Sequence, residues 1–192
     1  NPLSRIMVQP KDVSAEDINV TLGATWLTPH DIEDFMEDVF ESSVVGAKGG
    51  VTAFYSSEAG VWRIDNKGKD NGNTKVTLTY GYSAKMNAFH LTENALNLKT
   101  PNVYTTIQTV DGEKRVIDEQ ATMIAQEKQD NIKEAFSKWV FKDQARKERL
   151  VRYYNRHFNN IVPREYSGNE LKFPGMNPAI TLADHQKAAV AH

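Results

Sequence analysis

The chain has 192 residues, 40% of them hydrophobic, and a formal charge of −2 at pH 7, which suits one globular domain with appendages. This composition excludes fibrous and disordered classes, and the absence of cysteine excludes disulfides and thiolate metal sites and fits a cytoplasmic protein. No apolar run approaches the roughly 18 residues of a membrane span and no signal peptide is visible, so we expect no membrane partner.

Charge is distributed unevenly along the chain. Residues 1–60 carry ten acidic and three basic side chains, a formal charge of −7. Residues 133–164 carry nine basic and three acidic side chains, a formal charge of +6. A basic segment of this kind binds a polyanion or docks on an acidic neighbour.

The first expected elements form an acidic helical start over residues 12–41. Ser14 and Asp17 have capping-box spacing, which predicts a short helix to about Leu22, ending at Gly23. A second helix is expected to begin at Thr28-Pro29, with proline at its first position. Apolar residues at spacings of three and four define its buried face: Ile32, Phe35, Met36, Val39 and Phe40.

A small antiparallel β meander is expected over residues 51–80. A flexible connection over 44–50 leads into strands at Val51–Tyr55 and Val61–Asp65. β-Branched alternation predicts a third strand at Thr74–Tyr80. A helix over 84–97, capped by Ser83, is expected to follow the meander.

The second half is expected to hold a hairpin over 103–117 and a helical pair over 119–161. Asp111-Gly112 suits the hairpin turn because both positions tolerate positive φ. The first helix of the pair carries an apolar stripe: Ile124, Ile132, Phe136, Trp139 and Val140. The second helix begins near Asp143 and carries another: Leu150, Tyr153, Tyr154, His157, Phe158 and Ile161. The prediction is an α+β domain over 1–162, in which small antiparallel hairpins pack with several helices.

The end of the sequence contains an extended linker and the beginning of a further helix. Residues 163–180 are rich in proline and glycine and predict the linker. Thr181 and Asp184 then have the spacing of a helix start, and the helix over 181–192 is unfinished. The sequence is therefore expected to be a piece of a longer polypeptide.

Common catalytic motifs are absent from the sequence. The histidines are scattered, and the chain has no P-loop, no Gly-x-Ser-x-Gly and no Gly-x-Gly-x-x-Gly at a helix start. Gly46–Gly50 lacks the end of a phosphate-binding loop and is interpreted as a flexible loop. The carboxylates of residues 31–41 are interpreted as a solvated helix face. A metal-dependent nuclease built on them remains a minor alternative, and we predict no catalytic residues and no metal site.

The strongest candidate site is a basic ridge on the last expected helix. We define the basic ridge as Lys142, Arg146, Arg149, Arg152 and Arg156. Their spacing of three or four residues places the side chains along one side of a helix. Such a ridge can follow a phosphate backbone without sequence preference, or it can dock on an acidic domain. Tyr153 and Tyr154 have the chemistry to stack on bases but fit the core stripe better.

The order of several motifs carries a resemblance that spans nearly the whole chain. These motifs are Ile18–Pro29, Tyr80–Ala88, Leu96–Leu98, Ala121–Gln129, Phe136–Trp139, Arg149–Asn159, Pro163–Gly168, Phe173–Met176 and Leu182–Gln186. They resemble the region that joins two domains in large proteins of phages and conjugative elements. In that family an N6-adenine DNA methyltransferase domain precedes a superfamily-two, Swi/Snf-like helicase domain.

The resemblance implies a connecting role. It makes residues 181–192 the start of a helicase domain, in which Gln186 contacts the adenine of ATP only in the longer polypeptide. The family often has Leu-Arg-x-His-Gln where this chain has Leu182-Ala-Asp-His-Gln186. ATP with Mg²⁺ and S-adenosylmethionine are expected for the longer polypeptide, and no cofactor for this part.

The sequence therefore predicts a non-catalytic connecting domain that contacts DNA and the flanking methyltransferase and helicase domains. In the longer polypeptide it would couple DNA modification to ATP-dependent translocation or unwinding. The alternative is a structural spacer or protein-docking module with no DNA binding of its own.

Overall fold

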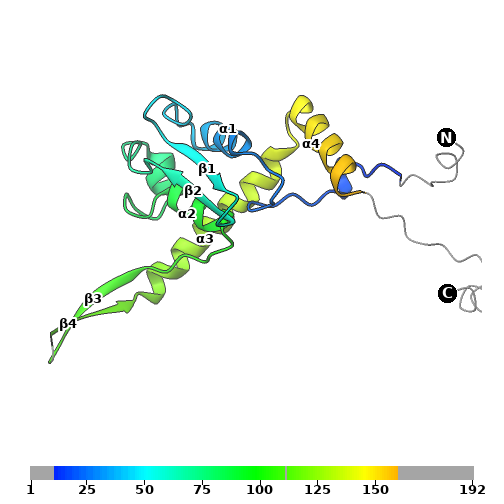
Figure 1. Ribbon diagram of the computed structural model, residues 1–192. Coiled ribbons are helices and arrows are strands. Elements are labelled where there is room, and N and C mark those ends of the chain that lie inside the picture. The colour runs from blue at the N-terminus through cyan, green and yellow to red at the C-terminus, as the bar shows by residue number, and fades with distance from the viewer. Residues whose placement is uncertain (1–10, 111, 160–192) are drawn as a thin grey trace, which may run out of the picture. The chain divides into compact units, whose positions relative to one another are not determined.

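A computed structural model describes residues 11–110 and 112–159. The chain forms two units by internal contacts, and the boundary falls within the last helix. One unit is Ser14–Arg152, and it contains most of the described secondary structure (Figure 1). The other comprises Asn1–Val13 and Tyr153–His192, of which residues 11–13 and 153–159 are described. The predicted linker at 163–180, Ile161 and the expected helix over 181–192 lie outside the described residues.

Helix α1, Pro29–Phe40, begins where the sequence predicts. The Thr28 side chain accepts a hydrogen bond from the Asp31 amide at 3.2 Å, and Asp31 Oδ2 accepts one from the Thr28 amide at 2.9 Å. This reciprocal capping box satisfies two amides that the helix itself leaves without partners. The apolar face of α1 is buried at Ile32, Phe35, Met36 and Phe40.

The helix predicted from Ser14 to Leu22 is wrong. Only Ala15–Asp17 forms a 3₁₀ turn, and the Ser14 hydroxyl donates to Asp17 Oδ2 at 2.8 Å instead of capping a backbone amide. Beyond the turn, Ile18, Val20 and Leu22 are buried while the residues between them are exposed. Burial at every second residue is the pattern of extended backbone, which places all three apolar side chains on the core.

Strands β1, Thr52–Ser56, and β2, Val61–Asp65, form an antiparallel hairpin in which Ala53 pairs with Ile64 and Tyr55 with Trp62. The third strand predicted at Thr74–Tyr80 is wrong, because Lys75–Thr79 forms a π-helical turn. Asn73 starts this turn: its carbonyl accepts the Thr77 amide and its side chain accepts the Lys75 amide. The expected meander is therefore a two-stranded sheet followed by a helical turn.

Helix α2, Ala88–Leu96, begins later than predicted and is capped by Asn87, not by Ser83. The Asn87 side-chain oxygen accepts the His90 amide at 3.2 Å. Ser83 caps a tight turn instead, in which its carbonyl and hydroxyl accept the Met86 amide. Phe89, Leu91, Ala95 and Leu96 are buried on the side of α2 that faces the core.

Side chains from the two helices complete the hydrogen bonding of the β1–β2 hairpin. Glu33 of α1 accepts the Ala53 amide at 2.8 Å. On the other edge, Glu93 of α2 accepts the Ile64 amide at 2.6 Å, and Asn97 accepts the Trp62 amide and donates to the Trp62 carbonyl, each at 2.8 Å. The outward-facing amides of Trp62 and Ile64 on the β2 edge, and that of Ala53 on the β1 edge, therefore have partners within the fold.

The predicted second hairpin is confirmed, but its turn lies earlier than predicted, because Gly112 pairs with Thr109 and begins the second strand. Strands β3, Tyr104–Thr109, and β4, Gly112–Ile117, pair antiparallel, and Gly112 has a φ of +117° that suits glycine. The hairpin extends away from the helices (Figure 1). At its base, Thr122 of the following helix accepts the Val103 amide at 2.9 Å.

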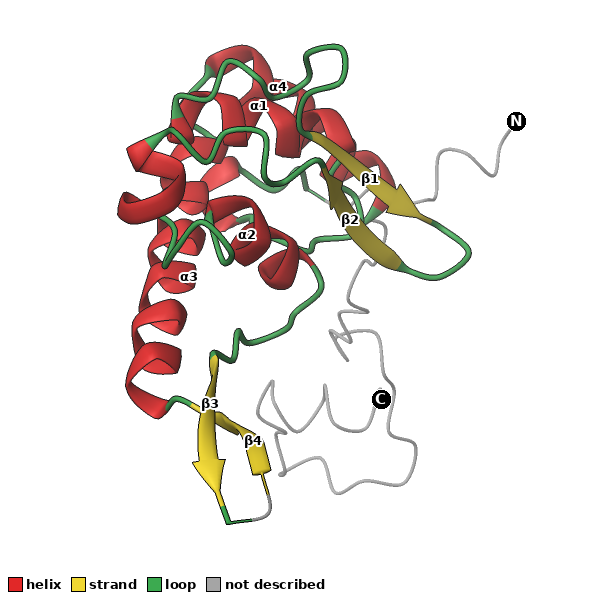
Figure 2. Ribbon diagram, turned by 90° about the vertical axis from the view of Figure 1, so that its left-hand side faces the viewer, coloured by secondary structure: helices red, strands yellow, loops and turns green. Residues whose placement is uncertain are grey.

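Two longer helices complete the α+β fold, as predicted. Helix α3, Glu119–Val140, is capped by Asp118 and runs past α2 (Figure 2), and helix α4 is Gln144–His157. The α3 stripe is buried at Ile132, Phe136, Trp139 and Val140, whereas Ile124 is 40% exposed. Phe35 lies edge-on to Phe136 at 5.1 Å and to Trp139 at 5.5 Å between ring centroids, which joins α1 to α3 in the core.

Candidate nucleic-acid interface

The predicted basic ridge lies on α4 and on the loop before it. The Asp143 side chain starts the helix by accepting the Arg146 amide at 2.8 Å. Of the apolar stripe predicted for this helix, Leu150 is buried, whereas Tyr153 is 42% and Phe158 45% exposed. The predicted stripe is therefore buried at Leu150, half-buried at Tyr154 and exposed at Tyr153 and Phe158. His157 is exposed, stacks on Tyr153 and hydrogen-bonds its carbonyl, so it is not a core histidine.

Arg146 is engaged within the fold. Its guanidinium lies 3.5 Å from the centroid of the Trp139 ring and donates to the carbonyls of Trp139 and Val140 at 3.0 and 3.1 Å. These carbonyls end α3, where a positive charge complements the helix dipole. The Trp139 indole in turn donates to Asp38 of α1 at 2.8 Å. Arg146 therefore ties the start of α4 to the end of α3, with two of its five N–H donors bound to backbone carbonyls.

Arg149 is also engaged, because it forms an ion pair with Asp31 of α1. The Asp31 side chain is 1% exposed and the Arg149 side chain 51%. Burial raises the pKa of Asp31, but hydrogen bonds from Arg149 and Thr28 and the positive charge of Arg149 outweigh it, so the pKa lies below its ordinary value. The pair fixes the first part of α4 against the start of α1.

Lys142 and Arg152 differ from these two residues. Both are exposed, and neither side chain has a hydrogen bond or ion pair within the described part of the chain. Arg156, in the other unit, is likewise exposed and unpaired among the described residues. The basic ridge therefore divides by its contacts: Arg146 and Arg149 bind partners within the fold, whereas Lys142 and Arg152 in the same unit, and Arg156 in the other, have no side-chain partner among the described residues.

Lys142 also lines a groove of about 850 Å³ between α1 and the end of α3. Its charged lining is mixed: Lys75, Lys138, Lys142 and Arg146 face Asp38, Glu41 and Asp143. Lys75 pairs with Glu41 at 2.5 Å and Lys138 with Glu134 at 2.6 Å. The groove is therefore close to balanced in charge, and on electrostatic grounds it is not an anion cleft.

The carboxylates of α1 are less solvated than the sequence predicts. Asp31, Glu33 and Asp38 bind Arg149, the Ala53 amide and the Trp139 indole, respectively. Across residues 11–110 and 112–159, no three histidine or carboxylate side chains come together in a way that could hold a metal ion.

The Gly46–Gly50 segment is a closed turn. The Gly46 amide donates to the Val51 carbonyl and the Gly50 amide to the Ala47 carbonyl, each at 2.8 Å. A Cβ at Gly50 would lie 1.9 Å from the Val44 carbonyl oxygen, so only glycine fits. These two amides therefore bond to carbonyls of neighbouring residues in the chain.

Sequence reasoning identified the basic residues but not their partners. Asp31 and Asp38 lie more than 100 residues from Arg149 and Trp139, so no local spacing links them. Gln186 lies outside the described residues, and no described residue is assigned to ATP or S-adenosylmethionine. No described helix is both long enough and apolar enough to cross a membrane.

Comparison with known proteins identifies the family but not its activity. The model of a domain of unknown function, DUF8437, matches residues 21–160, and the chain belongs to this family. No curated protein and no solved structure matches the chain significantly.

Proposed function

We propose that this domain is a non-catalytic connecting module of a larger DNA methylase–helicase polypeptide, and that it contacts DNA through Lys142, Arg152 and Arg156. The observation that carries the proposal is that these three cations are exposed and unpaired among the described residues. The motif order described above supports the larger context, in which ATP and S-adenosylmethionine are used by the flanking domains. A cytoplasmic location is part of the same proposal.

The physical basis is contact with phosphate that does not depend on base sequence. Each lysine or arginine that neutralises a phosphate releases a condensed counterion, so binding weakens as salt rises. Arg146 and Arg149 contribute indirectly, because they hold the start of α4 against α1 and α3. The proposal therefore rests on three of the five residues of the predicted contact.

Fluorescence anisotropy with duplex and single-stranded DNA at several salt concentrations tests the proposal. Combined alanine substitution of Lys142, Arg152 and Arg156 should weaken binding to every sequence and reduce the salt slope by about 3, or about one per phosphate contact. A matched control replaces Lys48, Lys69 and Lys85, which are exposed loop lysines without side-chain partners among the described residues. The control variant should bind like the unsubstituted chain.

Two outcomes would contradict the proposal. Equal loss in both triple variants would mean that binding follows net charge, not the surface of α4. No binding by the unsubstituted chain at low salt would leave the structural spacer or protein-docking alternative. That alternative is favoured by the internal use of Arg146 and Arg149, and it predicts binding to a flanking domain added in trans.

A further inference from the structure

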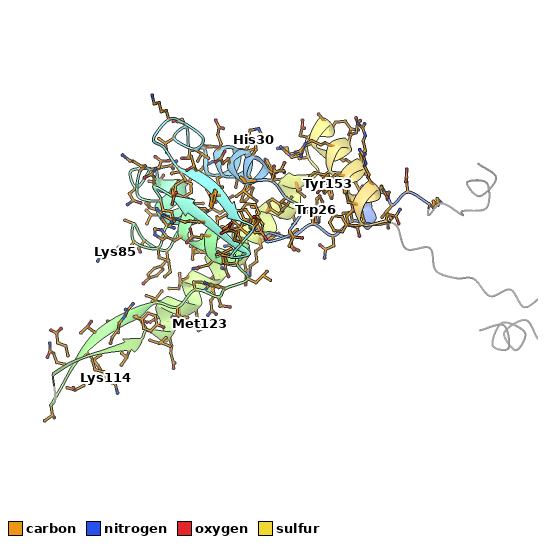
Figure 3. The ribbon with its side chains drawn as sticks, viewed as in Figure 1. Trp26, His30, Lys85, Lys114, Met123 and Tyr153 are labelled. Atoms are coloured by element: carbon orange, nitrogen blue, oxygen red, sulfur yellow. The ribbon has the colours of Figure 1, made fainter. Side chains whose placement is uncertain are left out.

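The β3–β4 hairpin packs little against the rest of its unit. All six residues of β3 are exposed, and in β4 only Val116 is half-buried. Tyr104, Ile107 and Ile117 are between 42% and 50% exposed. Figure 3 shows Lys114 far out on the hairpin and Met123 near its base. A two-stranded hairpin is marginal alone, so this one gains from a further strand.

The pairing register shows which backbone groups face outward. The Asp118 amide donates to the Val103 carbonyl at 2.9 Å, which makes these two residues a hydrogen-bonded pair. Such pairs alternate with non-hydrogen-bonded pairs in an antiparallel ladder. Tyr104–Ile117, Thr106–Arg115 and Gln108–Glu113 are therefore the non-hydrogen-bonded pairs. The amide and carbonyl of each of these six residues point away from the partner strand.

These outward groups have no partners within the described part of the chain. The β2 strand of the other hairpin provides the contrast, because Glu93 and Asn97 bond to its outward groups, and Glu33 bonds to the Ala53 amide of β1. Both edges of β3–β4 are thus open to strand addition.

The two edges are not equally open. β4 carries Glu113, Lys114 and Arg115, and charged side chains on an edge strand disfavour pairing with another strand. β3 has the sequence Tyr-Thr-Thr-Ile-Gln-Thr, with no charge and no proline, and its register with β4 is continuous without a bulge. The open edge is therefore that of β3.

We propose that β3 pairs with β3 of a second copy of this chain, antiparallel, around a two-fold axis at Thr106. In this register Thr106 faces Thr106 of the second copy, Tyr104 faces Gln108, and Thr105 faces Ile107. Cross-strand pairs of threonine and of β-branched residues stabilise sheets. The result is a continuous four-stranded sheet with the order β4–β3–β3–β4.

Self-pairing fits this strand better than binding to a polyanion. No charged side chains meet across the two-fold axis, and an isologous interface requires this self-complementarity. The hairpin has two acidic and two basic residues over 103–117, so it has no net attraction for phosphate. This surface is separate from the cations of α4.

Sedimentation velocity of the 192-residue chain over a range of concentrations tests the proposal. The chain should show a reversible monomer–dimer equilibrium. Thr106→Lys and Thr106→Glu place like charges against each other at the axis, so each variant alone should lose dimer. An equimolar mixture of the two variants should restore it, because the introduced lysine of one copy then faces the introduced glutamate of the other.

The control is Lys114→Glu, which changes charge on the strand that does not face the second copy, and it should dimerise like the unsubstituted chain. Far-UV circular dichroism and urea unfolding establish that each variant is folded. A chain that stays monomeric at all concentrations overturns the proposal, as does a mixture of the two Thr106 variants that fails to associate. Loss of dimer in Lys114→Glu would place the contact on β4 and would also overturn it.

Discussion

Arg149 and Arg152 are three residues apart on one helix and have the same chemistry, yet their surroundings differ. Arg149 meets a carboxylate that is 1% exposed, whereas Arg152 meets no described partner. Removal of one member of a buried ion pair leaves the other charge without compensation, whereas removal of an exposed charge costs little. Loss of the Arg149 side chain should therefore lower stability, whereas loss of the Arg152 side chain should weaken ligand binding with little effect on stability.

Arg149→Ala should lower the free energy of unfolding by about 1–3 kcal/mol at pH 7. This is below the loss for a fully buried pair, because Arg149 is half exposed and Asp31 keeps its hydrogen bonds from Thr28. Arg152→Ala should change the free energy by less than about 0.5 kcal/mol. Urea unfolding of the three proteins measures both values, and an equal loss in the two variants would refute the assignment of roles.

The Asp31–Arg149 pair also predicts a pH dependence. Since the pKa of folded Asp31 lies below its ordinary value, the ionised carboxylate stabilises the fold above that value. The stabilisation is lost as pH falls through the folded-state pKa. The difference in free energy of unfolding between the unsubstituted chain and Arg149→Ala should therefore become smaller in acid. Urea unfolding repeated below about pH 4 measures it. A constant difference would mean that Arg149 acts by packing alone.

At the scale of elements, the β1–β2 hairpin shows how two helices complete a sheet. Glu93 accepts the Ile64 amide and also pairs with Lys67 Nζ, both at 2.6 Å. Ile64 is 1% exposed, so its amide has little access to water if this acceptor is lost. A side-chain acceptor on α2 therefore takes the hydrogen-bonding position that a third strand would otherwise fill.

Glu93→Ala should lower the free energy of unfolding by about 1–3 kcal/mol, the cost of an unsatisfied buried amide. Glu93→Gln keeps an acceptor oxygen and should recover part of the loss. Glu127→Ala, at an exposed position of α3 without a side-chain partner in the described residues, serves as the control and should be near neutral. If Glu93→Ala matches that control in urea unfolding, the edge does not depend on Glu93.

At the scale of the whole molecule, stability should be unevenly distributed over the Ser14–Arg152 unit. Phe35, Phe40, Phe89 and Phe136 are fully buried, and they come from α1, α2 and α3. The β3–β4 hairpin contributes no residue to this core. Regions with few buried apolar contacts open at lower free energy than the core does.

Amide hydrogen exchange in dilute solution measures this distribution. The paired amides of Thr105 and Ile107 should exchange at least about 100-fold faster than those of Ile132 and Phe136, because the hairpin can open without exposing the core. Equal protection in the hairpin and in α3 would show that the hairpin unfolds only with the whole unit.

The sequence alone determined the elements whose signals are local. Thr28 and Asp31 define the start of α1 within one turn, Gly112 permits the β3–β4 turn, and apolar spacing marks α3 because each signal acts over a few residues. The α+β class and the position of the basic residues follow from these signals. DNA contact and the connecting role remain predictions.

Only the tertiary structure decided the backbone conformation where local signals conflict, and the role of a side chain where its partner is distant in the sequence. β-Branched alternation at 75–79 predicted a strand, but Asn73 hydrogen bonds and the burial of Val76 made it helical. The helical spacing predicted the same role for Arg146 and Arg149 as for Arg152, but Arg146 contacts Trp139 and Arg149 pairs with Asp31. A side chain becomes structural or available through residues far away in the chain, and sequence spacing carries no information on those contacts.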